Sequence, residues 1–185
     1  EWIKLHTKTA FDRAAVQPKA KVQAKADRSG ITTHFGKIMP LCHLKHAELA
    51  PEFQKYKGRI VFRGDDVRDQ DGFKAVFTEQ GASANHMAAN KFVDVIARLP
   101  GCKGQDADAN QAYTQIALSE ATELLGIGVV PEIWVTLPKD QWPADGSWEG
   151  IENPVCPLRL NLYGHPLAGL LWEKGCQKRL ESLGF

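Results

Sequence analysis

Several features are scarce or absent in this sequence. No run of about 18 apolar residues occurs and no signal peptide is visible, so the sequence offers no candidate for a membrane-spanning helix. The formal net charge is only +1, which excludes a global field that recruits nucleic acid, so any basic surface must be local. The hydrophobic fraction of 43% is nevertheless enough for the core of one domain or of part of a larger one.

Cysteine is also sparse, and no Cys-x-x-Cys pair occurs. The simplest interpretation is a set of free thiols in a reducing compartment, at Cys42, Cys102, Cys156 and Cys176. His43 and His46 lie close to Cys42, as in one half of a zinc site. No second half with metal-ligand spacing follows, so a zinc site is not expected.

The first 36 residues are polar and basic, with weak periodicity. Seven Lys and Arg residues stand against three acidic residues within the first thirty, a composition typical of a solvated segment. We predict that residues 1–36 are a poorly ordered lead-in, with contact to nucleic acid as the alternative. Because the chain begins at Glu1 rather than Met and ends at Phe185 directly after a helical pattern, we expect both ends to be cut from a longer polypeptide.

Hydrophobic periodicity predicts strands and helices along the rest of the chain. Strands are predicted at residues 40–44, 59–63, 105–113, 133–137 and 156–162. Helices are predicted from the N-cap Ser83 to Leu99, at 119–125 and at 167–183. The first two strands should form a hairpin. This order predicts an α+β fold, in which helices cover one face of a small antiparallel sheet.

Asp108 is the first candidate for chemistry. It lies in Gln-Asp-Ala-Asp-Ala-Asn-Gln-Ala-Tyr-Thr-Gln, residues 105–115. A carboxylate at the end of a short strand is well placed to bind a hard cation such as Mg²⁺, which prefers oxygen ligands. Asp106 would lie on the same face of an ideal strand and could assist. From spacing alone, two solvated acids at a strand end remain the favoured interpretation.

The context of Asp108 changes this interpretation. The pattern Asp-x-x-x-Ala-aromatic, which ends at Tyr113, resembles the first palm motif of copia-type (LTR retrotransposon) reverse transcriptases. Three further segments resemble the same family in the same order, at 55–64 (Lys-Tyr-Lys-Gly-Arg-Ile-Val-Phe-Arg-Gly), 132–138 and 158–164, the last followed by Trp172-Glu173. The sequence departs from the family after Gly164, where Pro166 stands in place of the family's lysine.

The resemblance implies that residues 37–185 form a partial reverse transcriptase domain, with the fingers and the first part of the palm. It implies that Asp108 binds catalytic Mg²⁺ (or Mn²⁺), and that Tyr113 packs under the sugar of the incoming nucleotide and excludes a ribose 2′-hydroxyl. It further assigns nucleotide contacts to Lys57, Arg59, Arg63 and Gly164. Without the resemblance, Tyr113 would be interpreted as a core aromatic and the basic residues as an exposed strand face.

The resemblance also implies partners: an RNA or DNA template-primer, a deoxynucleoside triphosphate, and the remainder of a retrotransposon polyprotein in the cytoplasm or nucleus. Polymerases of this type use two metal ions held by a later aromatic-x-Asp-Asp, which this sequence lacks. The only Asp-Asp is Asp65-Asp66, which follows Gly64 in a turn. We therefore expect an RNA-directed DNA polymerase fragment that is inactive alone. The alternatives are a non-catalytic nucleic-acid-binding remnant and a fragment with no function of its own.

Overall fold

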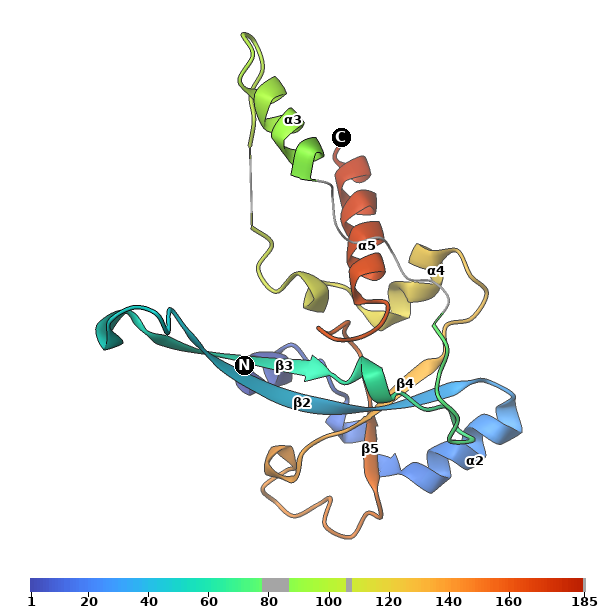
Figure 1. Ribbon diagram of the computed structural model, residues 1–185. Coiled ribbons are helices and arrows are strands. Elements are labelled where there is room, and N and C mark those ends of the chain that lie inside the picture. Colours follow the sequence, from blue (N-terminus) through green and yellow to red (C-terminus); the bar gives the residue numbers. More distant parts are fainter. Residues whose placement is uncertain (78–86, 106–107, 185) are drawn as a thin grey trace.

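The computed structural model describes residues 1–77, 87–105 and 108–184 (Figure 1). The strands in these residues are β1 (Gln17–Pro18), β2 (Thr33–Lys45), β3 (Lys55–Phe62), β4 (Glu132–Thr136) and β5 (Pro154–Pro157). The α-helices are α1 (Trp2–Thr7), α2 (Lys19–Ser29), α3 (Met87–Ala97), α4 (Ala121–Leu125) and α5 (Ala168–Ser182). The predicted α+β class is confirmed.

The five strands form one mixed sheet in the order β1-β5-β4-β2-β3. β2 and β4 run parallel, and the other neighbouring pairs run antiparallel. The prediction of an antiparallel sheet is therefore wrong for the β2–β4 pair. A parallel pair needs a long crossover connection, and the chain between β2 and β4 supplies one that contains β3, α3 and α4.

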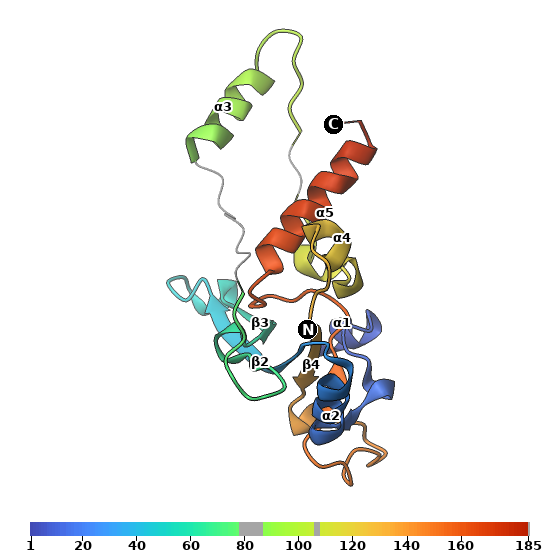
Figure 2. The same cartoon turned by 90° about the vertical axis from the view of Figure 1, so that its right-hand side faces the viewer.

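Helices cover both faces of the sheet, which corrects the prediction of a single covered face. Phe35 and Trp134 are register partners on β2 and β4, and they pack with Val22 of α2 in one buried cluster. Val135 follows Trp134 and so points to the opposite face, where it belongs to a larger cluster that includes Leu5 of α1. Figure 2 shows α2 on one side of the sheet and α4 and α5 on the other.

Residues 1–36 are an integral part of the fold, and the prediction of a poorly ordered lead-in is wrong. They contain α1, β1, α2 and the start of β2. The sequence of α2, Lys-Ala-Lys-Val-Gln-Ala-Lys-Ala-Asp-Arg-Ser, consists largely of strong helix formers. Val22 and Ala26 lie one turn apart and form its buried stripe. So narrow a stripe is difficult to recognise among surrounding lysines.

β2 and β3 form a long antiparallel hairpin that projects from the body of the molecule (Figure 1). The predicted hairpin is confirmed, although both strands are longer than the apolar runs that indicated them. Ile38 and Phe62 anchor its base in the core, and beyond them most side chains of the hairpin are exposed. The connection between the two strands contains a 3-10 turn at Pro51–Phe53.

The strand predicted at 105–113 is not formed by the described residues of that segment. Gln111 has a left-handed backbone (φ +53°), and a 3-10 helix, η4 (Ala112–Gln115), follows it. A strand needs a neighbouring edge to which its backbone can bond. The described residues 105 and 108–113 do not pair with any strand of the sheet, not even with β3, which is an edge strand. The strand predicted at 156–162 is shorter than expected and ends at Pro157.

The predicted C-terminal helices are confirmed as α4 and α5, which pack on each other around Ile116, Ala121, Leu167 and Leu171. The third predicted helix is α3; its proposed N-cap, Ser83, lies outside the described residues. The apolar side chains of α3 are exposed, among them Phe92 and Val95. Within the described residues, no helix combines the length and the apolar character that a bilayer crossing requires.

Candidate functional site

A cavity of about 460 Å³ brings together residues that are far apart in the sequence. Asp108 and Thr114 line one wall, and Lys57 and Arg59 of β3 line another. Tyr163 contributes from the segment after β5, and α1 contributes Lys4 and its neighbours. Three of the residues predicted for nucleotide or metal binding, Asp108, Lys57 and Arg59, therefore meet at one cavity.

The segment that carries Tyr163 is fixed to the inner end of β3. The backbone N–H of Phe62 donates to the carbonyl oxygen of Tyr163 at 2.7 Å. Gly164 has a φ of +82°, and a side chain at this position would collide with the Phe62 carbonyl oxygen. The resemblance assigned a nucleotide contact to Gly164; in the structure the close approach of its backbone is to β3. Gly164 does not itself line the cavity.

Thr114 anchors the segment that carries Asp108. Its buried hydroxyl donates to the carbonyl oxygen of Gln111 at 3.0 Å and accepts from Nζ of Lys8 at 2.9 Å. This second bond ties η4 to the N-terminal segment, for which the sequence predicted no part in the site. Asp108 itself is exposed at the rim of the cavity, where its carboxylate is accessible to a ligand.

Tyr113 does not line the cavity, but it packs directly behind a residue that does. The rings of Tyr113 and Tyr163 meet edge to face, with centroids 4.5 Å apart and an interplanar angle of 63°. The guanidinium carbon of Arg59 lies 5.7 Å from the centroid of the Tyr163 ring, within cation–π distance. Tyr163 thus contacts one predicted site residue on each side.

The basic residues of β3 continue into a cationic surface along the hairpin. Lys45 lies opposite Lys55, and His43 lies opposite Lys57, while Leu41 lies opposite Arg59. Because these cross-strand pairs alternate with apolar pairs, five side chains form a basic face: His43, Lys45, Lys55, Lys57 and Arg59.

The charges of the basic face are only weakly compensated: Glu1, at the same cavity, attracts Lys57 but is not ion-paired with it. Within the described residues, none of its lysines nor Arg59 forms an ion pair with an acid. Repulsion from Lys45 first, and then from Arg59, lowers the pKa of Lys57 below its usual value. A bound anion would relieve this repulsion, so the surface is suited to phosphate groups.

Arg63 is separate from this cavity, contrary to the prediction that it shares a site with Lys57 and Arg59. It follows the last residue of β3, and its guanidinium binds Asp65 through Nη2–Oδ2 at 2.7 Å and Nε–Oδ1 at 3.3 Å. This contact raises the pKa of Arg63 and lowers that of Asp65. With its charge already paired, Arg63 is a poor phosphate ligand in this conformation.

The described residues do not by themselves make a Mg²⁺ site. Asp108 supplies one carboxylate, and Asp106 lies outside the residues that the structure describes. No cluster of three or more His, Cys, Asp or Glu side chains suited to a metal ion is found in the described part of the chain. Mg²⁺ needs octahedral oxygen coordination, so a single carboxylate requires further ligands from outside this set.

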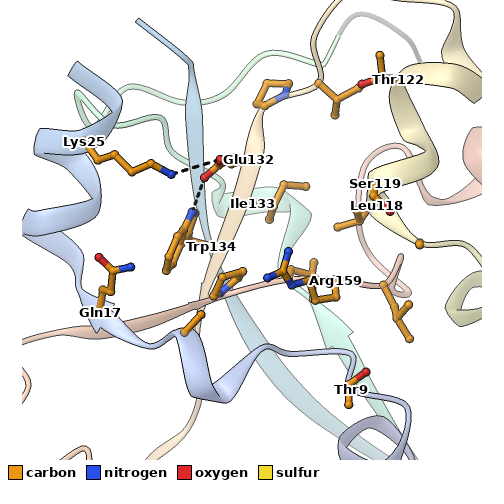
Figure 3. Close-up of a pocket in the computed structure, with 17 residues that line it drawn as sticks. Thr9, Gln17, Lys25, Leu118, Ser119, Thr122, Glu132, Ile133, Trp134 and Arg159 are labelled. Atoms are coloured by element: carbon orange, nitrogen blue, oxygen red, sulfur yellow. Dashed lines mark hydrogen bonds and ion pairs between the residues drawn. The ribbon is translucent and has the colours of Figure 1, made fainter. Parts of the chain in front are cut away.

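A larger cavity of about 550 Å³ opens where β4 and the chain after β5 diverge (Figure 3). Its charged side chains are already paired. Glu132 accepts from Lys25 at 3.5 Å and from Nε1 of Trp134 at 3.1 Å, and Arg159 binds Asp12 at 2.5 Å. This cavity therefore offers a ligand less free charge than the smaller one beside Asp108.

Sequence reasoning missed three contributors to the site: Lys45, Lys55 and Tyr163. The two lysines could have been found by writing out the hairpin register, since period-two alternation places them on the face of Lys57. Tyr163 lies in the Leu-Tyr-Gly segment that marked Gly164, but its contacts with Tyr113 and Arg59 depend on tertiary structure. No sequence signal indicated the contribution of α1.

A scan against protein-family models, a search of curated proteins and a search of solved structures each found no match to this chain.

Proposed function

We propose that this chain is the nucleotide-binding part of an RNA-directed DNA polymerase, with partial fingers and palm formed by residues 37–185. The observation that carries the proposal is the meeting of Asp108, Lys57 and Arg59 at one cavity. These residues come from two segments about fifty positions apart, and each was assigned to phosphate or metal binding by the resemblance to copia-type reverse transcriptases.

Each side chain has a defined task in this proposal. Arg59 offers a planar fork of N–H donors to a triphosphate, and Lys57 adds a compact charge beside it. Tyr113 packs behind Tyr163, and in this proposal it acts through the Tyr163 ring, which limits the space next to the sugar and favours a deoxynucleotide. Asp108 is one ligand of a Mg²⁺ or Mn²⁺ ion whose other carboxylate ligands are not found among the described residues.

The partners follow from the same assignment. The basic face tracks the phosphates of a template or primer strand, which reaches the cavity along the hairpin. The remainder of a retrotransposon polyprotein would supply the aromatic-x-Asp-Asp carboxylates, in a cytoplasmic particle or in the nucleus. The 185-residue chain alone should bind nucleotide without polymerising it.

Two measurements on the purified chain test this proposal. Titration with dCTP should show binding that Arg59→Gln weakens, whereas Arg63→Gln, which removes a charge already paired with Asp65, should have a smaller effect. Absence of nucleotide binding, or equal effects of the two variants, would contradict the proposal. A primer-extension assay with the chain alone should give no product. Mg²⁺-dependent synthesis that Asp108→Asn abolishes would contradict the expectation that the chain alone cannot polymerise.

The unpaired basic face favours a second candidate, a non-catalytic nucleic-acid-binding module. Such a module would bind single strands through phosphates alone, so its affinity would fall steeply with salt and would not depend on free nucleotide. Competition between dCTP and a single-stranded oligonucleotide separates the two candidates. A polymerase site binds both at the cavity, whereas the module binds only the oligonucleotide.

A further inference from the structure

We propose that Tyr163 is a positioning residue: its ring, which lines the cavity, holds the Arg59 guanidinium on the phosphate-binding side and is itself held in place from behind by Tyr113. The inference rests on the proposed function, since it concerns how the same cavity recognises a nucleoside triphosphate. The resemblance assigns roles to Arg59 and Tyr113 but none to the Tyr163 side chain.

The first argument is the contact geometry. The guanidinium carbon of Arg59 lies over the Tyr163 ring, 5.7 Å from its centroid. The Tyr113 ring meets the same ring edge to face, with the two centroids 4.5 Å apart. Within the described residues, the side chains of Arg59 and Tyr113 make no hydrogen bond or ion pair. The Tyr163 ring is therefore the aromatic contact that restrains both of them.

The second argument is that Tyr163 is itself well anchored. Its carbonyl oxygen accepts from Phe62 at the end of β3, and the preceding Leu162 is only 1% exposed. The residue nevertheless remains 37% exposed and lines the cavity. A fixed backbone with an accessible ring is the arrangement expected of a side chain that orients neighbouring groups toward a ligand.

The third argument is electrostatic. Arg59 lies on the same hairpin face as Lys57, and the two cations repel each other. Attraction to the electron-rich face of Tyr163 opposes this repulsion and holds the guanidinium at the cavity. Loss of the ring would free Arg59 to move toward solvent and would release Tyr113 at the same time. The affinity for triphosphate and the preference for dCTP over CTP should therefore change together.

The test measures inorganic triphosphate, dCTP and CTP binding to the chain and to its variants. Tyr163→Leu should weaken triphosphate binding about three- to tenfold, and it should lower the preference for dCTP over CTP. Tyr163→Phe keeps the ring and should restore most of both properties. Lys174→Gln on α5, an exposed cation away from the cavity, is the charge-matched control for Arg59→Gln.

Double variants separate positioning from a purely structural role. Arg59→Gln combined with Tyr163→Leu should bind triphosphate no more weakly than Arg59→Gln alone, because the ring acts through the guanidinium. Likewise, Tyr113→Leu combined with Tyr163→Leu should discriminate between dCTP and CTP no less than Tyr113→Leu alone. Additive losses in both pairs would overturn the inference, as would unchanged triphosphate affinity in Tyr163→Leu. Tyr163→Gln provides a second ring-free variant if Tyr163→Leu fails to fold.

The outcomes also distinguish this inference from the proposed function. If the chain binds inorganic triphosphate with the Arg59–Tyr163 coupling but shows no preference between dCTP and CTP, the polymerase assignment fails and the positioning of Arg59 stands. If nucleotide binding and discrimination are present but Tyr163→Leu changes neither, the polymerase assignment stands and the inference fails. If the chain binds no triphosphate at all, both fail.

Discussion

Lys45 and Lys55 lie directly opposite each other near the outer end of the β2–β3 hairpin. Like charges in such a position destabilise a strand pair, and no acid of the described residues is ion-paired with either one. The repulsion has a clear use if phosphates bind along this face, because a bound anion would turn an unfavourable pair into a favourable cluster.

Replacement of one member of this pair should separate stability from binding. Lys55→Glu should raise the free energy of unfolding by roughly 0.2–1 kcal/mol, because an opposite charge then faces Lys45. The same change should weaken binding of a single-stranded oligonucleotide. Urea denaturation and fluorescence anisotropy measure the two effects. Lys174→Glu on α5 carries the same change of charge, and equal loss of binding in this variant would show that only net charge matters.

The salt dependence of oligonucleotide binding should report the number of contacts on the basic face. For a single strand, each phosphate neutralised contributes about 0.7 to the slope of log K against log salt concentration. The double variant Lys45→Gln, Lys55→Gln should therefore lower the slope by about 1.4. An unchanged slope would place the nucleic acid elsewhere on the molecule.

Helix α2 should be necessary for the stability of the sheet. Val22→Ala should lower the free energy of unfolding by about 1–3 kcal/mol, because it leaves a cavity against Phe35 and Trp134. Lys21→Ala, one residue away and exposed, is the matched control and should have little effect. Urea denaturation followed by tryptophan fluorescence checks both. If Val22→Ala were as stable as Lys21→Ala, α2 would not pack on the sheet as described.

Two glycines with similar backbone angles should respond differently to alanine. Gly126 has a φ of +65° and open space where a Cβ atom would lie, whereas Gly164 has a φ of +82° and faces the Phe62 carbonyl oxygen. Gly126→Ala should cost about 1–2 kcal/mol from backbone strain alone. Gly164→Ala adds the steric collision, so it should cost more and should also displace Tyr163. Equal thermal stability of the two variants would show that β3 can move away.

Stability should fall as the pH is lowered through the range in which the unfolded chain protonates His165. Burial lowers the pKa of His165 to about 4, and its Nδ1 accepts from the backbone N–H of Leu167. The unfolded state therefore binds more protons between about pH 6.5 and 4, and unfolding becomes easier there by up to about 1.4 kcal/mol per pH unit. Burial lowers the pKa of His34 as well, so this residue also makes the folded state less stable as the pH falls.

Replacing His165 isolates its share of this effect. His165→Phe should flatten the dependence of the unfolding free energy on pH below about 6.5, and the remaining slope should come from His34 and the acids. Urea titrations at several pH values measure the slope. A slope identical to that of the unchanged chain would mean that His165 is charged in the folded state or does not titrate.

Local patterns in the sequence were enough for the longest elements. The apolar runs of β3 and β4 and the leucine spacing of α5 predicted one arm of a hairpin, a further strand and a terminal helix, because burial of one face imposes its period on the residues. The same rule failed for α2, whose buried stripe is narrow, and for the described residues between 105 and 113, because strand formation depends on a neighbouring strand as well as on the residues themselves.

The sequence by itself determined which residue types are available at the candidate site: the carboxylate of Asp108, the cations of β3 and the aromatic rings. Only the tertiary structure decided which of them meet. Arg59 reaches the cavity and Arg63 does not, since β3 ends between them and Asp65 binds the Arg63 guanidinium. The parallel β2–β4 pair and the Tyr113–Tyr163 contact were likewise decided by long-range packing, which joins segments whose separation along the chain carries no local signal.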